Sequence, residues 1–470
     1  MNVLMVASEA TPFAKTGGLA DVIGGLPPAL AARGERVAVV IPDYRENVYP
    51  NPPAVAYRNL WIPVGPGFMT AIYQVTERGV TFYFVHCPPL FDRAGIYSSG
   101  GADHPDNNLR FAVLSMAALN IGRYLFSPQI IHTHDWQAAL TPVYLREHFA
   151  SDPSFIGVKT LFTIHNLGYQ GIFDQGALAE IGLSGKLFNP NQLEFYGKLN
   201  FLKGGIAFSD AVSTVSKGYA REIQTPEYGF GLDGFLRTHA PIHGIVNGVD
   251  YEEWNPEHDP YIARKYSEND LSGKRACKQA LLKEFGLPDQ PNRPLIGIVS
   301  RFASQKGFDL IAQTAAELVD EDLSMVVLGS GEQEFENMFR QLANARPDKV
   351  AVRIGYDNAL AHRIEAGADM FLMPSRYEPC GLSQIYSLRY GAVPVVRATG
   401  GLDDTIGVDT GFKFKDYSGI ALMEALRLAL ETFRHKNDWV GIMRRGMRKD
   451  FSWGTAAEEY MEIYRSLLAV

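Results

Sequence analysis

The sequence predicts an α/β protein with two doubly wound domains, each built on a mainly parallel sheet with helices on both faces. Short apolar runs rich in β-branched residues alternate with helical stretches along the whole chain. The runs are almost continuously apolar, as expected for strands buried on both faces of a parallel sheet. The length of 470 residues exceeds what one hydrophobic core accommodates and favours two to four domains.

Eleven apolar runs are candidate strands, and they divide into two sets along the chain. Two such sets, each interspersed with helices, indicate two doubly wound domains rather than one large sheet. The first set comprises residues 2–8, 36–42, 81–87, 129–135, 159–166 and 210–216, and the second comprises residues 294–301, 324–330, 350–356, 368–375 and 392–398.

The boundary between the domains is predicted near residues 242–260, where a passage rich in Pro, Asp and Glu interrupts the apolar pattern. We therefore assign residues 1–245 to an N-terminal Rossmann-like domain and residues 246–455 to a C-terminal one. Residues 456–470 are expected to form a helix that packs back on the N-terminal domain, because its apolar side chains share one face. These side chains are Tyr460, Met461, Tyr464, Leu467 and Leu468.

One short motif occurs twice. Residues 16–24 read "TGGLADVIG" and residues 399–407 read "TGGLDDTIG", with identity at seven of nine positions. One interpretation is convergence on a favourable helix-start turn. The other is that each domain presents a glycine-started helix towards a deep cleft that the two domains share.

Composition and charge exclude several functional classes. The formal net charge of −8 argues against a nucleic-acid coat or a protein that binds anionic membranes. We find no apolar run long enough for a signal peptide or a membrane-spanning helix. The three cysteines, Cys87, Cys277 and Cys380, are widely spaced and odd in number, which indicates reduced thiols in a cytoplasmic protein.

The stretch "AKTGGLADVIGGL", residues 14–26, places a lysine and glycines between a strand and a helix. It fits neither the P-loop, in which the lysine follows the glycines, nor the dinucleotide fingerprint G-x-G-x-x-G. Glycines nevertheless allow a close approach of the backbone, and helix N-terminal amides attract anions. Lys15, Gly17 and Gly18 are therefore candidates for an anion site, the alternative being a tight turn with a solvated lysine.

Polar side chains recur where predicted strands end. Arg301 and Lys306 follow one strand, Glu378 and Cys380 follow another, and two further strands end in His134–Asp135 and His165–Asn166. Ligands of doubly wound sheets bind at the carboxyl ends of the strands, so these clusters indicate a binding site for an anionic ligand.

Two more specific interpretations of these clusters are disfavoured. In "HTHD", strand alternation puts His132 and His134 on one face and Asp135 on the other, which separates the would-be metal ligands. Cys380 has no histidine close in sequence, so a small buried thiol is favoured over a nucleophile. We expect no metal and no cofactor.

The same residues carry a resemblance to bacterial glycogen synthases and plant starch synthases. The motifs occur in the family's order, from about residue 1 to about residue 465, and the ordered set is highly specific. They are "KTGGLADV", "HTHDW", "TIHNLGYQG", "VNGVD", "SRFASQKG", "GYDNALAHRIEAGADMFLMPSRYEPCGLSQIYSLRYG" and "TGGLDDT". The resemblance implies the glycosyltransferase fold with two Rossmann-like domains (GT-B). It also implies transfer of glucose from ADP-glucose to the non-reducing end of an α-1,4-glucan such as glycogen, with retention of configuration.

The resemblance also implies roles for individual residues. Arg301 and Lys306 match the diphosphate clamp, Glu378 matches the glutamate that holds hydroxyls of the donor glucose, and His165 matches a residue that lines this sugar. Tyr356 matches a tyrosine that stacks on adenine. The further residues implied in nucleotide-sugar binding are Lys15, Gly17, Gly18, Asp21, Asn166, Asn247, Cys380, Gly381 and Leu382. Tyr97 and Asp135 are implied on the acceptor side.

One position departs from wider relatives of the family, and two other functions are alternatives. Many wider relatives carry a second glutamate eight residues after the first, where this chain has Tyr386. A transferase that uses UDP-glucose or another acceptor, or a catalytically silent glucan-binding protein, remains an alternative.

Overall fold

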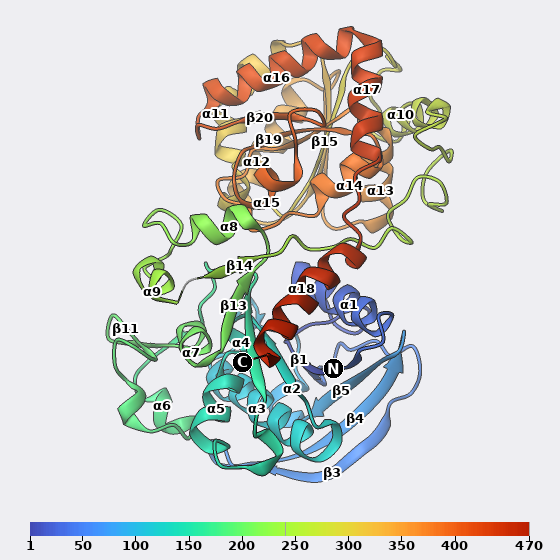
Figure 1. The fold of residues 1–470 in the computed structure, drawn as a ribbon. Helices are drawn as coiled ribbons and strands as arrows, with labels where there is room; N and C mark the ends of the chain where they lie inside the picture. Colours follow the sequence, from blue (N-terminus) through green and yellow to red (C-terminus); the bar gives the residue numbers. More distant parts are fainter. Residues whose placement is uncertain (240, 470) are drawn as a thin grey trace. The chain divides into compact units, whose positions relative to one another are not determined.

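The computed structural model describes residues 1–239 and 241–469, and within them the chain forms two compact units (Figure 1). Unit 1 comprises Met1–Val215, Ala220–Gly248 and Trp453–Val470, and unit 2 comprises Ser216–Tyr219 and Val249–Ser452. Ala240 and Val470, which fall in the predicted N-terminal domain and the predicted C-terminal helix, lie outside the described residues. Each unit is an α/β structure with a largely parallel sheet, which confirms the predicted fold class.

The large sheet of unit 1 has the strand order β14-β13-β9-β8-β1-β2-β5-β4-β3 within the described part of the chain. All neighbours from β14 to β5 are parallel, and β4 and β3 add an antiparallel edge. The strands are β1 (Asn2–Val6), β2 (Arg36–Pro42), β3 (Ala54–Ile62), β4 (Phe68–Glu77), β5 (Val80–His86), β8 (Ile130–His134), β9 (Lys159–Ile164), β13 (Ala211–Thr214) and β14 (Ile242–Gly244).

Helices cover both faces of this sheet. Alternate residues of β1, such as Val3 and Met5, pack in one core with α1 and α18, whereas α3 contacts β2 and packs on α5. The helices of unit 1 are α1 (Gly18–Ala31), α2 (Pro88–Phe91), α3 (Asn107–Ile121), α4 (Asp135–Ala138), α5 (Leu140–His148), α6 (Ala177–Glu180), α7 (Phe201–Phe208), α9 (Asp233–Thr238) and α18 (Trp453–Leu468), and α8 (Lys217–Glu222) spans the junction with unit 2.

Short elements complete unit 1. Two small antiparallel sheets pair β6 (Ser98–Ser99) with β7 (Ala102–Asp103), and β12 (Lys198–Asn200) with both β10 (Ile172–Phe173) and β11 (Glu194–Phe195). Helical turns occur at η1 (Gly122–Phe126), η2 (Pro153–Phe155) and η3 (Gly185–Leu187).

One helix differs from the expectation that no segment could cross a membrane. Residues Asn107–Phe126, which join α3 to η1, are long and apolar enough to do so by length and composition. However, 72% of the apolar stretch within these residues is buried inside the protein. It is therefore a core helix that packs against α5 and β2.

The sheet of unit 2 has the order β17-β16-β15-β18-β19-β20, with every described neighbour parallel. In chain order this is 3-2-1-4-5-6, so the order reverses between β15 and β18. The strands are β15 (Leu295–Val299), β16 (Ser324–Gly329), β17 (Val350–Ile354), β18 (Met370–Met373), β19 (Val393–Arg397) and β20 (Phe412–Phe414).

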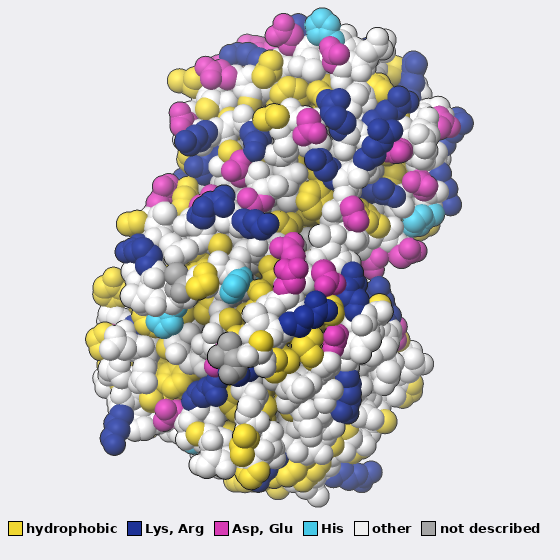
Figure 2. Space-filling model, in the orientation of Figure 1, with side chains coloured by type: hydrophobic (Ala, Val, Ile, Leu, Met, Phe, Trp, Pro, Cys, Tyr) yellow, Lys and Arg dark blue, Asp and Glu magenta, His cyan; other side chains and the backbone are white. Residues whose placement is uncertain are grey.

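Unit 2 has a core on each face of its sheet. Ile296 and Ile298 of β15 pack with α11, α12 and α16, whereas Leu295 packs with α10 and α13. On the visible face, basic side chains gather over α17 although the chain is acidic as a whole (Figure 2). The helices are α10 (Ser272–Glu284), η4 (Ser304–Lys306), α11 (Phe308–Asp320), α12 (Gln333–Ala345), α13 (Asn358–Gly367), α14 (Ser383–Arg389), α15 (Gly400–Thr405), α16 (Gly419–Arg434) and α17 (Lys436–Met447).

The last helix of the chain belongs to unit 1. The helix α18 lies beside α1 (Figure 1) and buries Tyr460, Met461 and Tyr464 in the core formed with β1 and β2. Leu467 and Leu468 pack partly against the same core, so the five side chains share one face as the periodicity predicts.

The two "TGGL" segments occupy different places in their sheets. The first leads into α1, directly after β1, whereas the second leads into α15, directly after β19. In unit 2 the helix that follows the first strand is α11. The two segments therefore follow the first strand of one sheet and the fifth strand, in chain order, of the other.

Candidate functional site

The candidate site in unit 2 lies at the reversal point of the sheet. A cavity of about 180 Å³ opens at the carboxyl ends of β15 and β18, where doubly wound sheets bind ligands. It is lined by Ile298, Val299, Ser300, Arg301, Lys306, Phe308, Leu372, Met373, Pro374, Ser375 and Ser383.

An ion pair joins the two strand-end clusters at this cavity. The Nζ atom of Lys306 lies 2.6 Å from Oε2 of Glu378, and Ser375 Oγ donates to the same oxygen at 3.1 Å. The Glu378 side chain is only 7% exposed and that of Lys306 is 19% exposed. Because burial makes an unpaired charge costly, each member holds the other in place.

A glycine allows the two clusters to meet. Gly307, at φ 74°, follows Lys306 directly, and a Cβ atom there would lie 1.9 Å from the carbonyl oxygen of Pro374. Any other residue would separate the loop after β15 from the loop after β18.

The turn that carries Glu378 is fixed from the other side by α15. The Gly401 N–H donates to the Glu378 carbonyl oxygen at 3.0 Å, and a Cβ on Gly401 would meet the Cys380 carbonyl oxygen at 2.1 Å. Cys380 is buried and reduced, as are Cys87 and Cys277. Gly381 and Leu382, both partly exposed, complete the turn into α14.

The remaining predicted residues of unit 2 are exposed. The side chain of Arg301, which follows β15, makes no hydrogen bond or ion pair within residues 1–239 and 241–469. Tyr356, beyond the end of β17, is 84% exposed, so its ring presents a free face. Tyr386, where wider relatives have a second glutamate, stacks on Trp254 with ring centroids 4.0 Å apart and therefore supports α14.

In unit 1, the candidate anion loop is held by a carboxylate that sequence reasoning missed. Glu9 is 3% exposed and accepts hydrogen bonds from the N–H and hydroxyl of Thr16 and from the Gly17 N–H at 3.2 Å. Lys15 pairs with Asp21 at 2.6 Å, and burial raises the pKa of Asp21 against the lowering effect of Lys15. The Gly17 N–H is therefore already bound to a carboxylate of the protein itself, that of Glu9.

Tyr97 reaches the same carboxylate. Its hydroxyl donates to Glu9 and lies 2.7 Å from Ser8 Oγ. Burial and the Glu9 charge raise the pKa of Tyr97, so the hydroxyl stays protonated. The predicted acceptor-side residue and the predicted anion loop are thus joined through Glu9.

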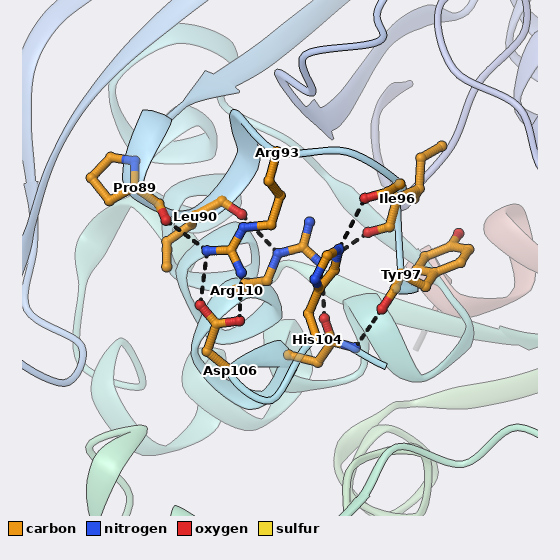
Figure 3. A network of polar contacts seen from close by, with 10 residues as sticks. Pro89, Leu90, Arg93, Ile96, Tyr97, His104, Asp106 and Arg110 are labelled. Carbon is orange, nitrogen blue, oxygen red and sulfur yellow. Dashed lines mark hydrogen bonds and ion pairs between the residues drawn. The ribbon is translucent and has the colours of Figure 1, made fainter. Parts of the chain in front are cut away.

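A fully buried arginine fixes the segment that carries Tyr97 (Figure 3). Arg110 donates to the carbonyl oxygens of Leu90 and Ile96, each at 2.8 Å. Asn107, which accepts a hydrogen bond from Arg110 at 2.7 Å, donates in turn to the Tyr97 carbonyl oxygen at 3.0 Å. The guanidinium therefore stabilises the turn that presents Tyr97.

The ends of β8 and β9 bring His165 and Asp135 together. Asp135 follows β8 with a left-handed backbone, φ 57°, and its carboxylate accepts the His165 N–H at 2.7 Å. Burial raises the pKa of Asp135 to about 7 and lowers the pKa of His165 to about 3. A non-glycine residue in this conformation is strained, which is typical of functional sites.

Two asparagines follow strands of the large sheet of unit 1, Asn166 after β9 and Asn247 after β14. Asn166 Oδ1 accepts the Gly168 N–H at 2.9 Å and so shapes the loop after β9. Asn247 is 6% exposed, and its Oδ1 atom has no hydrogen-bond partner in the described part of the chain. An unsatisfied buried acceptor is suited to a ligand hydroxyl.

Comparisons with known proteins agree over the whole chain. The family model of the starch synthase catalytic domain matches residues 2–238, and that of group 1 glycosyl transferases matches residues 282–442. The chain is 52% identical to the glycogen synthase of Koribacter versatilis, over 99% of this chain and 98% of that protein. It is 48% identical to a glycogen synthase of an Anaeromyxobacter species, over 100% of both chains.

The chain belongs to the glycogen and starch synthase family.

Solved structures agree with this membership. The catalytic domain of starch synthase IV from Arabidopsis thaliana, bound to ADP and acarbose, superposes with a TM-score of 0.90 at 32% identity, covering 100% and 99% of the two chains. Sucrose-phosphate synthase from Thermosynechococcus elongatus, at 17% identity and a TM-score of 0.62 over 99% of each chain, shares the fold. The protein is thus a GT-B glycosyltransferase of the glycogen and starch synthase family.

Within this family framework, the structure joins some predicted residues and adds others. It brings together Lys306 with Glu378, Lys15 with Asp21, and His165 with Asp135. Glu9, Ser375 and Arg110 were missed, because each acts through a partner that is distant or unremarkable in sequence. No group of three or more His, Cys, Asp or Glu residues that could hold a metal ion occurs among the residues described.

Proposed function

We propose that this protein transfers glucose from ADP-glucose to the non-reducing end of an α-1,4-glucan, with retention of configuration. The observation that carries the proposal is the Lys306–Glu378 pair, which lies with Arg301 at the reversal point of unit 2. The glycogen synthase relatives and the ADP-bound starch synthase support the choice of donor and acceptor.

The proposed role of the cations is to stabilise the leaving group. The bond between glucose C1 and the phosphate oxygen breaks, and negative charge develops on the departing ADP. Lys306 has three donor hydrogens, of which one goes to Glu378, so two remain for phosphate oxygens. Arg301 has its whole guanidinium available for two-point binding of phosphate.

The proposed role of Glu378 is to hold hydroxyls of the donor glucose while keeping Lys306 in position. The acceptor hydroxyl oxygen forms the new bond to C1, and its proton passes to the leaving phosphate on the same face. This route needs neither a second carboxylate at Tyr386 nor a covalent intermediate, which fits the stacking of Tyr386 on Trp254.

We further propose that unit 1 contributes to the same reaction. Lys15 would meet phosphate, and His165, Asn166 and Asn247 would line the donor sugar, with the unsatisfied Oδ1 of Asn247 accepting a hydroxyl. Gly17 and Gly18 would shape the loop, whereas Asp21 would hold Lys15. In unit 2, Tyr356 would stack on adenine, and the turn formed by Cys380, Gly381 and Leu382 would present backbone groups to the donor.

The proposal also covers the acceptor side of the site, the cofactor requirement and the cellular location. Tyr97 and Asp135 would face the glucan. We propose that the enzyme needs no metal or other cofactor, acts in the cytoplasm, and binds neither nucleic acid nor membranes.

An ADP-release assay with glycogen tests the proposal. We expect turnover with ADP-glucose to exceed that with UDP-glucose, and we expect radiolabelled glucose to appear at glycogen chain ends. Equal or faster turnover with UDP-glucose would assign the protein to another donor class. Tight glycogen binding without ADP release would favour a catalytically silent glucan-binding protein.

A further inference from the structure

A chain of buried hydrogen bonds crosses unit 1 from the C-terminal helix to the middle of the sheet. The hydroxyl of Tyr464, on α18, lies 2.8 Å from Nδ1 of His132, on β8. The other ring nitrogen of His132 lies 2.6 Å from Thr163 Oγ1, on β9, which lies 2.6 Å from Ser213 Oγ, on β13. All four side chains are fully buried.

These contacts leave the imidazole of His132 no freedom to rotate. Both ring nitrogens are bound to hydroxyl groups on opposite sides, and the ring of Tyr460 packs at a centroid distance of 5.4 Å. Burial lowers the pKa of His132, so the ring is neutral and carries one N–H. One hydroxyl can therefore accept a hydrogen bond from the N–H of the ring, while the other hydroxyl donates to the unprotonated nitrogen.

The fixed ring of His132 supports a second histidine. His134 lies two residues further along β8 on the same face, and the two ring centroids are 4.0 Å apart. Nδ1 of His134 lies 3.0 Å from Nε2 of His165, the predicted donor-sugar residue at the end of β9. A continuous contact therefore runs from Tyr464 through His132 and His134 to His165.

The pattern of partners assigns the protons. Nε2 of His134 is buried and has no hydrogen-bond partner within the described residues. Buried N–H groups without an acceptor are rarer than acceptors without a donor, so the proton of His134 belongs on Nδ1. His134 then donates to Nε2 of His165, which leaves the proton of His165 on Nδ1.

We propose that Tyr464 and His132 are positioning residues that fix the orientation and the protonated nitrogen of His165 through His134. This inference rests on the proposed function, which gives His165 its place beside the donor sugar. It assigns to the C-terminal helix a role in preparing the site, in addition to closing the core of unit 1.

The experiment compares two matched tyrosines on α18. Tyr464→Phe removes the hydroxyl bound to His132, whereas Tyr460→Phe removes a hydroxyl one turn away that cannot bind His132, since both its nitrogens are taken. We expect Tyr464→Phe to lower kcat about tenfold with less than a twofold change in the KM for ADP-glucose. Tyr460→Phe should retain kcat at a similar melting temperature. Equal kcat values in the two variants would overturn the proposal.

A spectroscopic measurement tests the coupling between Tyr464 and His165 independently of enzyme activity. In protein with ¹⁵N-labelled histidine, the ring-nitrogen shifts distinguish the two neutral tautomers, and a His165→Gln variant assigns the His165 signals. We expect wild-type His165 to show one tautomer with the proton on Nδ1, and Tyr464→Phe to show a mixture. Unchanged His165 signals in Tyr464→Phe would refute the coupling.

A second pair of variants avoids α18 altogether. Thr163→Val removes the hydroxyl bound to Nε2 of His132 at nearly constant volume, and Thr163→Ser keeps it. The valine variant should reproduce the change in the His165 signals, and the serine variant should not. A wild-type protein that shows the expected signals but transfers no glucose would overturn the proposed function alone.

Discussion

At the scale of single residues, the most informative contact joins two side chains 72 positions apart, Lys306 and Glu378. Their pairing at 2.6 Å makes the two residues interdependent. Removal of either one leaves the other charge buried and unpaired, which is strongly unfavourable.

The first prediction concerns this pair and Arg301. Lys306→Ala and Arg301→Ala should each lower kcat about a hundredfold or more, which corresponds to about 3 kcal/mol of transition-state stabilisation. Glu378→Ala should be at least as damaging, because it frees both Lys306 and the donor sugar. Steady-state kinetics with Lys283→Ala, an exposed lysine on α10, as the control measures the effect. Near-native turnover of Lys306→Ala would remove the cationic clamp from the mechanism.

The second prediction concerns metal ions. If Arg301 and Lys306 supply the positive charge that the leaving diphosphate needs, glucosyl transfer should continue at its normal rate in excess EDTA. The initial rate of ADP release, measured before and after treatment with the chelator, tests this directly. Loss of activity that added magnesium restores would refute a mechanism based on fixed cations.

The third prediction concerns Asp135, whose pKa is raised to about 7 by burial. His165, with a pKa lowered to about 3, stays neutral near pH 7, so an inflection there belongs to Asp135. The pH profile of kcat/KM should therefore bend near pH 7 in the wild type and be flat from pH 6 to 8 in Asp135→Asn. A bend that persists in the variant would assign it to another group.

The same shift predicts how stability depends on pH. Because the folded-state pKa of Asp135 lies above its ordinary value of 3.8, the protonated carboxyl stabilises the folded state. This contribution is fully present below about pH 3.8 and is lost as the pH rises through 7. The melting temperature of the wild type, relative to that of Asp135→Asn, should therefore fall between pH 4 and pH 7.

At the scale of elements, α18 shows how a terminal helix becomes part of a distant core. It buries Trp453, Tyr460, Met461 and Tyr464 in unit 1, although the rest of that unit ends at Gly248. The Trp453 ring lies against Gly25 of α1, where an added Cβ would be 2.0 Å from the indole nitrogen. The junction of α1 and α18 therefore tolerates no extra side chain at this point.

The fourth prediction follows from this packing. Tyr464→Ala should destabilise unit 1 by about 3–5 kcal/mol, the usual cost of removing a buried aromatic ring. Termination after residue 455 should prevent folding of unit 1. Thermal or urea unfolding, with the exposed Glu462→Ala as the control, gives the comparison. Full activity of the truncated protein would show that α18 is dispensable.

Elements also show what the sequence could predict. Strands buried on both faces, such as β1 and β16, are almost wholly apolar and could be located in advance. The antiparallel strands β3 and β4 were missed, because they alternate exposed and buried residues and their pairing contains bulges that break the period. The short strand β14 was lost in the passage assigned to the domain boundary.

For the candidate site, the topology made part of the prediction possible. Polar residues directly after apolar strands gather at one edge of a parallel sheet, which is why Arg301, Glu378 and His165 could be singled out. Glu9 could not, because its importance arises from contacts with Gly17 and Tyr97 that only the folded chain creates. The contact between His132 and Tyr464 spans 332 residues, and no local pattern signals it.

At the scale of the whole molecule, both units are built on a largely parallel sheet, but they differ in how many separate segments of the chain form them. Unit 2 is nearly contiguous, from Val249 to Ser452, and Ser216–Tyr219 is its only other described part. Unit 1 takes its residues from three separate segments. The similarity to one glycogen synthase, at 52% identity, and to a starch synthase, at a TM-score of 0.90, extends over the residues of both units.

The discontinuity of unit 1 has a consequence for synthesis on the ribosome. Translation proceeds from the N-terminus, so the segments up to Gly248 emerge long before Trp453–Leu468 is made. Until then the apolar face of α1 lacks its neighbour, and His132 lacks the Tyr464 hydroxyl. Unit 2 is translated in that interval and can fold before unit 1 has its last segment. The nascent N-terminal half therefore exposes apolar surface while unit 2 is made, and such transiently exposed surface favours aggregation.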